Sequence, residues 1–152
     1  GLEIRIARYH NIYGPLGAWN NGREKAPAAL ARKVCLASDG GTVEVWGDGL
    51  QTRSFLYIDD CLDASLKLME SEFCLPVNIG SEEMVSINAM VEILADISLK
   101  QVKIQNIDGP TGVRGRCSDN TLFNSAVADW KPAFDLRSGL IETYKWIQSQ
   151  VG

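Results

Sequence analysis

The sequence predicts an α/β fold in a single domain. Strand-like apolar runs alternate along the chain with segments whose apolar residues recur at helical spacing, and this alternation is typical of α/β or α+β proteins. The chain has 152 residues, a usual length for one domain, and no internal repeat or clear linker divides it. Hydrophobic residues make up 45% and charged residues 22%, which is ordinary for a globular protein.

The first third of the chain predicts a strand, a loop and a helix. Residues 3–9 alternate isoleucine with smaller or charged residues, as a strand does, and residues 13–25 are rich in Gly and Asn, as an ordered loop is. Pro27 suits the first turn of a helix that runs to about Ser38. Asp39-Gly40-Gly41 then predicts a tight turn, because glycine adopts positive φ without strain.

The middle of the chain predicts two strands and a second helix. Val43 to Trp46 and Ser54 to Ile58 are apolar runs, and the turn at Gly47-Asp48-Gly49 is expected to join them as a hairpin. Asp59 is expected to cap a helix that ends near Ser71, because its carboxylate can accept the free amides of the first turn.

The last part of the chain predicts further alternation. Residues 76–79 and 102–107 are expected to be strands. Helices are expected from Ile87, capped by Ser86, to about Ile97; from Ser118 or Asp119 to about Asp129; and after Asp135. In the last helix one apolar stripe recurs at helical spacing: Leu136, Leu140, Tyr144, Ile147 and Val151.

Charge and residue usage exclude several classes of protein. The net charge of −4 argues against a nucleic-acid partner, because no basic excess displaces counterions. No apolar run approaches the roughly 18 residues of a membrane-spanning helix. The 4 cysteines lack Cys-x-x-Cys spacing, which favours reduced structural thiols in a cytoplasmic protein. The single histidine, His10, excludes His-pair metal motifs, so no metal site is expected.

The motifs of a dinucleotide-binding redox site are missing from this chain. The segment Gly47-Asp48-Gly49-Leu50-Gln51-Thr52 has Thr where a third glycine is needed, and it leads into a strand although a pyrophosphate cradle opens a helix. No tyrosine is followed four positions later by lysine. We therefore expect no tight binding of NAD by this chain alone.

Two segments resemble the extended short-chain dehydrogenase/reductases that act on nucleotide sugars. The first, Arg8-Tyr9-His10-Asn11-Ile12-Tyr13-Gly14-Pro15, resembles the turn that enters their substrate domain. The second, Val43 to Asp60, resembles the pattern V-x-G-D-G-x-x-x-R-x-F-x-Y-V-x-D of that family. A third segment, Gly22-Arg23-Glu24-Lys25-Ala26-Pro27, looks like the proton-transfer loop of one branch, the GDP-mannose 3,5-epimerases.

The resemblance implies a particular portion of that fold. Residues 1–152 would be the C-terminal, nucleotide-sugar-binding portion, and the N-terminal NAD-binding half would be absent. The fold would combine a small α+β substrate lobe with the last strands and helix of an incomplete Rossmann-like sheet. NAD would be the cofactor of the intact enzyme. Such a chain is expected to form a homo-oligomer or to associate with an N-terminal half.

The resemblance also implies a set of substrate-binding residues: Asn11, Glu24, Lys25, Ala26, Lys33, Gln51, Thr52, Arg53 and Arg116. Arg53 and Arg116 would hold the nucleotide diphosphate, since the planar fork of arginine satisfies two phosphate oxygens at once. Lys25 would be one of two acid/base groups. The other group of the family, a cysteine, belongs to the missing half, and none of the 4 cysteines here lies in its context.

The implied function is that of an NAD-dependent isomerase acting on GDP-mannose or a related GDP-sugar. In the family, oxidation at sugar C4 acidifies the hydrogens at C3 and C5, protons are exchanged there, and the ketone is reduced again. This chain alone is expected to be inactive. Two alternatives remain: a non-catalytic GDP-sugar-binding module or inert truncated fragment, and a part of another nucleotide-sugar enzyme, a 4-epimerase or a 4,6-dehydratase.

Overall fold

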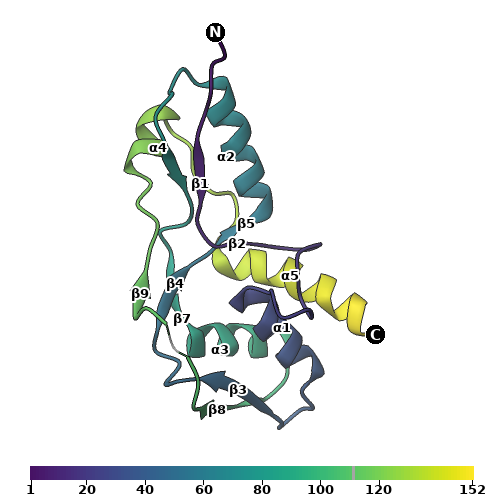
Figure 1. Cartoon of the computed structure of the whole chain (residues 1–152). Helices are drawn as coiled ribbons and strands as arrows, with labels where there is room; N and C mark the ends of the chain where they lie inside the picture. Colours follow the sequence, from purple (N-terminus) through teal and green to yellow (C-terminus); the bar gives the residue numbers. More distant parts are fainter. Residues whose placement is uncertain (111) are drawn as a thin grey trace.

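The computed structural model describes residues 1–110 and 112–152 and has an α/β architecture (Figure 1). Its helices are α1 (Ala26–Leu36), α2 (Ile58–Glu70), α3 (Ile87–Ser98), α4 (Thr121–Ala126) and α5 (Leu136–Val151). Its strands are β1 (Ala7–Tyr9), β2 (Ile12–Tyr13), β3 (Thr42–Trp46), β4 (Thr52–Ser54), β5 (Leu56–Tyr57), β6 (Val77–Ile79), β7 (Met84–Ser86), β8 (Lys103–Ile107) and β9 (Gly115–Arg116).

The strands form small sheets rather than one large one. Parallel pairs join β1 with β6, β2 with β5, and β3 with β8. A fourth sheet among the described residues places β4 between β7, which is antiparallel to it, and β9, which is parallel. Figure 1 shows β1, α2 and α4 in one half of the molecule and α1, α3, β3 and β8 in the other, with β2 and β5 between them.

Each half has its own apolar core. In the half that holds α2, Leu68, Ile79 and Phe123 are buried together. In the other half, α1 packs on α5 and α3, and its Ala31 and Val34 are fully buried. The predicted stripe of α5 is confirmed, because Leu136, Leu140, Tyr144 and Ile147 are buried and Val151 packs against them.

Lys100 fixes the end of α1, the helix that carries Ala26 and Lys33 of the predicted site. Its Nζ donates to the carbonyl oxygens of Val34 at 3.0 Å, Cys35 at 2.7 Å and Ala37 at 2.8 Å. These carbonyls lie at the end of α1, where a helix has acceptors without partners and a partial negative charge. The ammonium therefore ties the end of α1 to the segment that follows α3.

The predicted hairpin over residues 43–58 is wrong. β3 pairs in parallel with β8, so that Val43 lies opposite Ile104, and the chain then leaves this sheet. Gly47 and Gly49 have φ of 71° and 69°, and a Cβ on Gly49 would collide with the side chain of Asn88. The turn therefore delivers β4 to a different sheet. The expected strand at 54–58 is also divided, since β4 ends at Ser54 and α2 begins at Ile58.

Local signals at helix ends succeeded where the side chain caps the backbone. Ser86 Oγ accepts from Ala89 N at 3.1 Å, as predicted. The last helix follows Asp135 as predicted, and Asp135 Oδ1 accepts from Ser138 N at 2.7 Å. The predicted cap at Asp59 is wrong, because α2 begins at Ile58 and Tyr57, two residues before Asp59, occupies the cap position. Its neighbour Asp60 is buried, and accepts from backbone amides of the segment before α5.

The remaining differences between the predicted and the observed elements concern mainly their lengths. The expected helix to Asp129 stops at Ala126, and Asp129 has a left-handed φ of 61° that no continuing helix allows. The expected strand over residues 3–9 shrinks to Ala7–Tyr9, and β7 was not foreseen. Ile6 O still accepts a hydrogen bond from Val77 N of β6 at 3.0 Å, but the side chains of Ile4 and Ile6 remain 61% and 44% exposed.

An open sheet edge and a bare helix face mark one side of the half that holds α2. Among the described residues β1 pairs only with β6, so the other edge of β1 has no neighbouring strand. Parallel sheets are usually covered on both faces as well. On α2, Leu62, Leu66 and Met69 recur at helical spacing and are all more than half exposed. An unpaired edge and a contiguous apolar patch both favour association with another chain.

We expect this side of the molecule to be the least protected, or to be protected by self-association. Hydrogen exchange combined with light scattering tests this: in any monomeric fraction, the amides of residues 3–9 and 76–79 should exchange faster than those of 43–46. A monomer in which all of these amides are equally protected would contradict the interpretation of the chain as part of a larger sheet.

Candidate functional site

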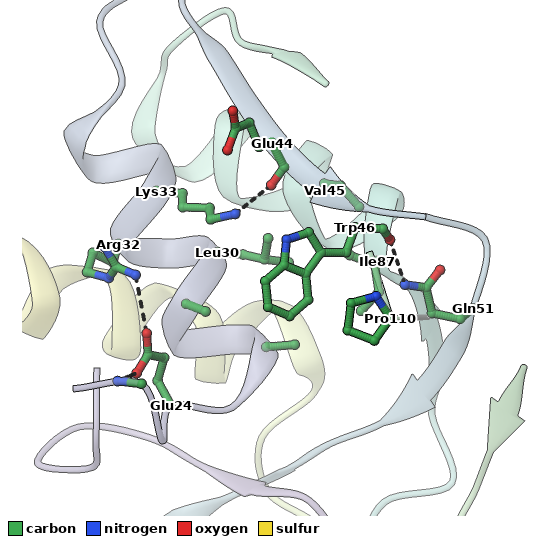
Figure 2. Close-up of a pocket in the computed structure, with 13 residues that line it drawn as sticks. Glu24, Leu30, Arg32, Lys33, Glu44, Val45, Trp46, Gln51, Ile87 and Pro110 are labelled. Carbon is green, nitrogen blue, oxygen red and sulfur yellow. Dashed lines mark hydrogen bonds and ion pairs between the residues drawn. The ribbon is translucent and has the colours of Figure 1, made fainter. Parts of the chain in front are cut away.

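A pocket between α1 and β3, here called the α1–β3 pocket, brings together four of the predicted site residues. It has a volume of about 400 Å³, and Glu24, Ala26, Lys33 and Gln51 are among its lining residues. Figure 2 shows the indole of Trp46 projecting into it between Leu30 and Pro110. Neither Trp46 nor Pro110 was predicted, because their place in the site depends on contacts between segments far apart in the sequence.

Glu24 is held by hydrogen bonds on both carboxylate oxygens. Its Oε2 accepts from Gly22 N at 2.7 Å, and its Oε1 accepts from Arg32 Nη2 at 3.2 Å, with 10% of the side chain exposed. Hydrogen bonds from its own backbone amide and from Gly22, together with Arg32, hold the pKa of Glu24 below its usual value. Arg32 also donates to Trp19 O at 3.0 Å, so the pair anchors the loop to α1.

Lys25 faces a different hollow from its neighbour Glu24. It lines a smaller pocket of about 110 Å³ together with Arg23, Tyr13 and Gly14. Lys25 is the N-cap residue of α1, where its carbonyl accepts the first helical hydrogen bond from Ala29 N at 3.0 Å. The structure therefore separates the predicted catalytic lysine from the α1–β3 pocket and places a second basic residue beside it.

Lys33 and Gln51 support the wall that β3 forms. Lys33 Nζ donates to Glu44 O at 2.7 Å. Gln51 Nε2 donates to Trp46 O at 3.2 Å, whereas Gln51 Oε1 is buried and has no hydrogen-bond partner among the described residues. The amide nitrogen of Gln51 is thus hydrogen-bonded, whereas its amide oxygen has no partner among the described residues.

The two arginines assigned to a diphosphate lie on neighbouring strands. The parallel register of β4 with β9 sets Arg53 opposite Arg116 and Thr52 opposite Gly115. Residues in register on parallel strands project from the same face of the sheet. Arg53 is half-buried and donates to Thr52 O at 2.7 Å, and Arg116 is exposed. By contrast, Arg114 pairs with Asp48 at 2.6 Å on the surface.

Asn11 has a structural place in the fold. Its Nδ2 donates to Ser54 O at 3.0 Å, and its backbone has a left-handed φ of 51°. It therefore joins the end of β4 to the residues before β2. The adjacent His10 lies close to the arginine pair: burial lowers its pKa from the ordinary value, and the charge of Arg116 lowers it further. His10 was not among the predicted site residues.

The glycine turn does not fit a dinucleotide. Residues 47–49 connect β3 to β4, and no helix begins there, so the turn lacks the helix N-terminus that binds a pyrophosphate. In the part of the chain that the structure describes, no group of three or more His, Cys, Asp or Glu side chains is placed to hold a metal. No described helix has the length and apolar content needed to cross a bilayer.

Comparison with known proteins shows which family the chain belongs to. The model of the NAD dependent epimerase/dehydratase family matches residues 1–80, which is more than half of the 152 residues. This chain belongs to that family. The predicted α/β class and the resemblance to nucleotide-sugar enzymes are therefore confirmed.

Individual relatives show which members of the family the chain is similar to. The chain is 52% identical to GDP-mannose 3,5-epimerase 1 of Oryza sativa subsp. indica and to GDP-mannose 3,5-epimerase of Arabidopsis thaliana, over 99% of its own length and 39% of theirs. Among solved structures, UDP-glucuronic acid 4-epimerase from Bacillus cereus, in complex with UDP-glucuronic acid and NAD, has a TM-score of 0.82 at 26% identity. That match covers 98% of this chain and 46% of the other.

Proposed function

We propose that this chain is the nucleotide-sugar-binding portion of an NAD-dependent epimerase whose ligand is GDP-mannose or a related GDP-sugar. The observation that carries the proposal is the register of β4 with β9, which sets Arg53 beside Arg116. Two guanidinium groups on one face of a small sheet offer several N–H donors to the oxygens of a diphosphate. The 52% identity to GDP-mannose 3,5-epimerases supports the choice of GDP-sugar.

Lys25 is the proton-transfer residue in this proposal. Lys25 lines the small pocket, as does Arg23. A cation next to a carbon that is losing a proton stabilises the developing enolate charge, and it can return a proton to the opposite face of the sugar. Glu24 and Arg32 are not assigned to proton transfer. Their ion pair instead holds the loop that leads to Lys25.

NAD would supply the hydride transfer of the intact enzyme, and we assign its binding to residues outside this chain because the glycine turn at residues 47–49 does not fit a pyrophosphate. A non-catalytic GDP-sugar-binding module is the second candidate, since the arginine pair on β4 and β9 needs no other group to bind a diphosphate. Such a module would keep the arginine pair and the α1–β3 pocket. A part of another nucleotide-sugar 4-epimerase or 4,6-dehydratase is disfavoured by the loop Gly22 to Pro27, which resembles the 3,5-epimerases.

Calorimetric titration with three nucleotides tests the binding claim. We expect GDP to bind, GMP to bind more weakly because it lacks the second phosphate for the arginine pair, and NAD not to bind at micromolar concentration. GMP is the matched control for the base and ribose. Equal binding of GDP and GMP, or micromolar binding of NAD, would contradict the proposal.

A further inference from the structure

Arg116 lies on a short strand at the edge of its sheet. β9 has 2 residues, and its neighbour among the described strands is β4. All of residues 112–117 are exposed, so this stretch buries no apolar side chain that could fix it. The first buried side chains after Arg116 belong to Ser118 and Asn120, and both are polar. Beyond the pairing with β4, the position of Arg116 therefore depends on the hydrogen bonds of these two residues.

The side chain of Asn120 joins this segment to the end of β6. Its Nδ2 donates to Gly80 O at 2.8 Å, and its Oδ1 accepts from Ser118 Oγ at 2.6 Å. Both side chains are buried, so breaking either bond would leave a polar atom without a partner and away from water. A Cβ on Gly80 would lie 2.6 Å from Ser118 Cβ, which shows that the segment lies directly against the backbone of Gly80. Asn120 therefore fixes the segment after β9 relative to β6.

The N-terminus of α4 does not use this side chain. Asn120 occupies the N-cap position, where asparagine usually accepts a hydrogen bond from a helix amide, but it makes no such bond. Asp119 Oδ1 instead accepts from Thr121 N at 3.0 Å. Asn78 of β6 donates from its Nδ2 to Asp119 O at 3.0 Å, so a second asparagine attaches the same segment to β6. Helix capping therefore does not explain the buried and paired side chain of Asn120.

We propose that Asn120 is a positioning residue for the diphosphate site, which holds Arg116 in its place beside Arg53. The inference rests on the proposed function for the identity of the ligand. Pairing with β4 fixes one end of the segment and the bonds of Asn120 to the end of β6 fix the other, so Arg116 lies between two anchors. The ion pair of Arg114 with Asp48 is a weaker tie, because it is exposed to solvent. Without Asn120, the guanidinium of Arg116 would have to be ordered at the moment of binding, which lowers affinity.

Calorimetric titration of Asn120→Ala with GDP and GMP tests this role. GDP should bind about fivefold more weakly, and GMP should change less because it lacks the second phosphate. Added to Arg116→Ala, the same substitution should cause no further loss, whereas added to Arg53→Ala it should still weaken GDP binding. A general structural defect would instead weaken GDP and GMP alike and would add to the effect of Arg116→Ala. Asn124→Ala, which changes an exposed asparagine of α4, is the matched control and should bind both nucleotides normally.

Hydrogen exchange separates this inference from the proposed function, because it needs no ligand. Thr52 N donates to Arg114 O at 2.9 Å, so the Thr52 amide reports the pairing of β9 with β4. This amide should exchange about tenfold faster in Asn120→Ala, while the amides of β3 keep their rates. Ser118→Ala removes one of the two buried bonds and should show the same effect if Asn120→Ala does not fold.

The two measurements together decide the outcome. If the unaltered protein binds GDP, an unchanged GDP affinity in the variant, or an equal loss for GDP and GMP, refutes the positioning role and leaves the proposed function standing. An unchanged exchange rate at Thr52 refutes the positioning role as well. If the Thr52 amide exchanges faster but the unaltered protein does not bind GDP, the positioning of Arg116 stands and the proposed function fails.

Discussion

Replacing Lys25 by alanine should reduce kcat by roughly 100- to 10,000-fold in a protein that joins this chain to an NAD-binding half of the family. The Michaelis constant should change much less, because the ammonium acts on the charge that develops at C3 and C5 rather than on the bound substrate. Steady-state rates of GDP-mannose epimerisation measure both constants.

Lys103→Ala is the control for that experiment, since Lys103 lies exposed on β8, away from both pockets. Its rate should stay near that of the unaltered protein. Near-normal epimerisation by Lys25→Ala would remove Lys25 from the mechanism. A raised Michaelis constant with unchanged kcat would instead make Lys25 a binding residue.

Loss of Arg53 should weaken GDP binding by about 2–3 kcal/mol, the usual effect of removing a charge-assisted hydrogen bond from a desolvated site. Arg116→Ala should cost less, about 1–2 kcal/mol, because Arg116 is exposed and solvent screens its charge. Because both side chains are assigned to one diphosphate, their effects should not add in the double variant.

Arg114→Ala is the matched control, because Arg114 is an exposed arginine two residues before Arg116 that pairs with Asp48. Calorimetry should find GDP affinity nearly unchanged in this variant. Equal, small losses in all three single variants would reject the assignment of the diphosphate to Arg53 and Arg116.

Local signals predicted the helices well. Ser86 caps α3 as expected, and α5 follows Asp135 as expected, because a capping side chain bonds to amides two or three residues away and needs nothing else from the fold. Strand pairing was predicted poorly. The partner of β3 is β8, far along the chain, and a hairpin is the simpler expectation whenever a glycine turn separates two apolar runs.

The candidate site shows the same contrast between residues that could be predicted and spatial arrangements that could not. Resemblance selected Lys25, Gln51, Arg53 and Arg116 and assigned the two arginines to one diphosphate, but it did not indicate that Lys25 and Gln51 line different pockets. The separation of Lys25 from Gln51 into two pockets depends on how α1 packs, and the pairing of the arginines depends on the register of β4 with β9. Arg32 was missed because its only signal, an ion pair with Glu24, exists after the loop has folded onto α1.

Solvent deuterium exchange tests the central claim most directly. The chain would be incubated with GDP-mannose and NAD in D₂O, alone and after mixing with a separately produced NAD-binding half of the family. We predict that deuterium enters the sugar at C3 and C5 only in the mixture, and that Lys25→Ala abolishes this incorporation. A mixture that binds GDP-mannose but leaves C3 and C5 unlabelled would contradict the account and leave the chain as a binding module.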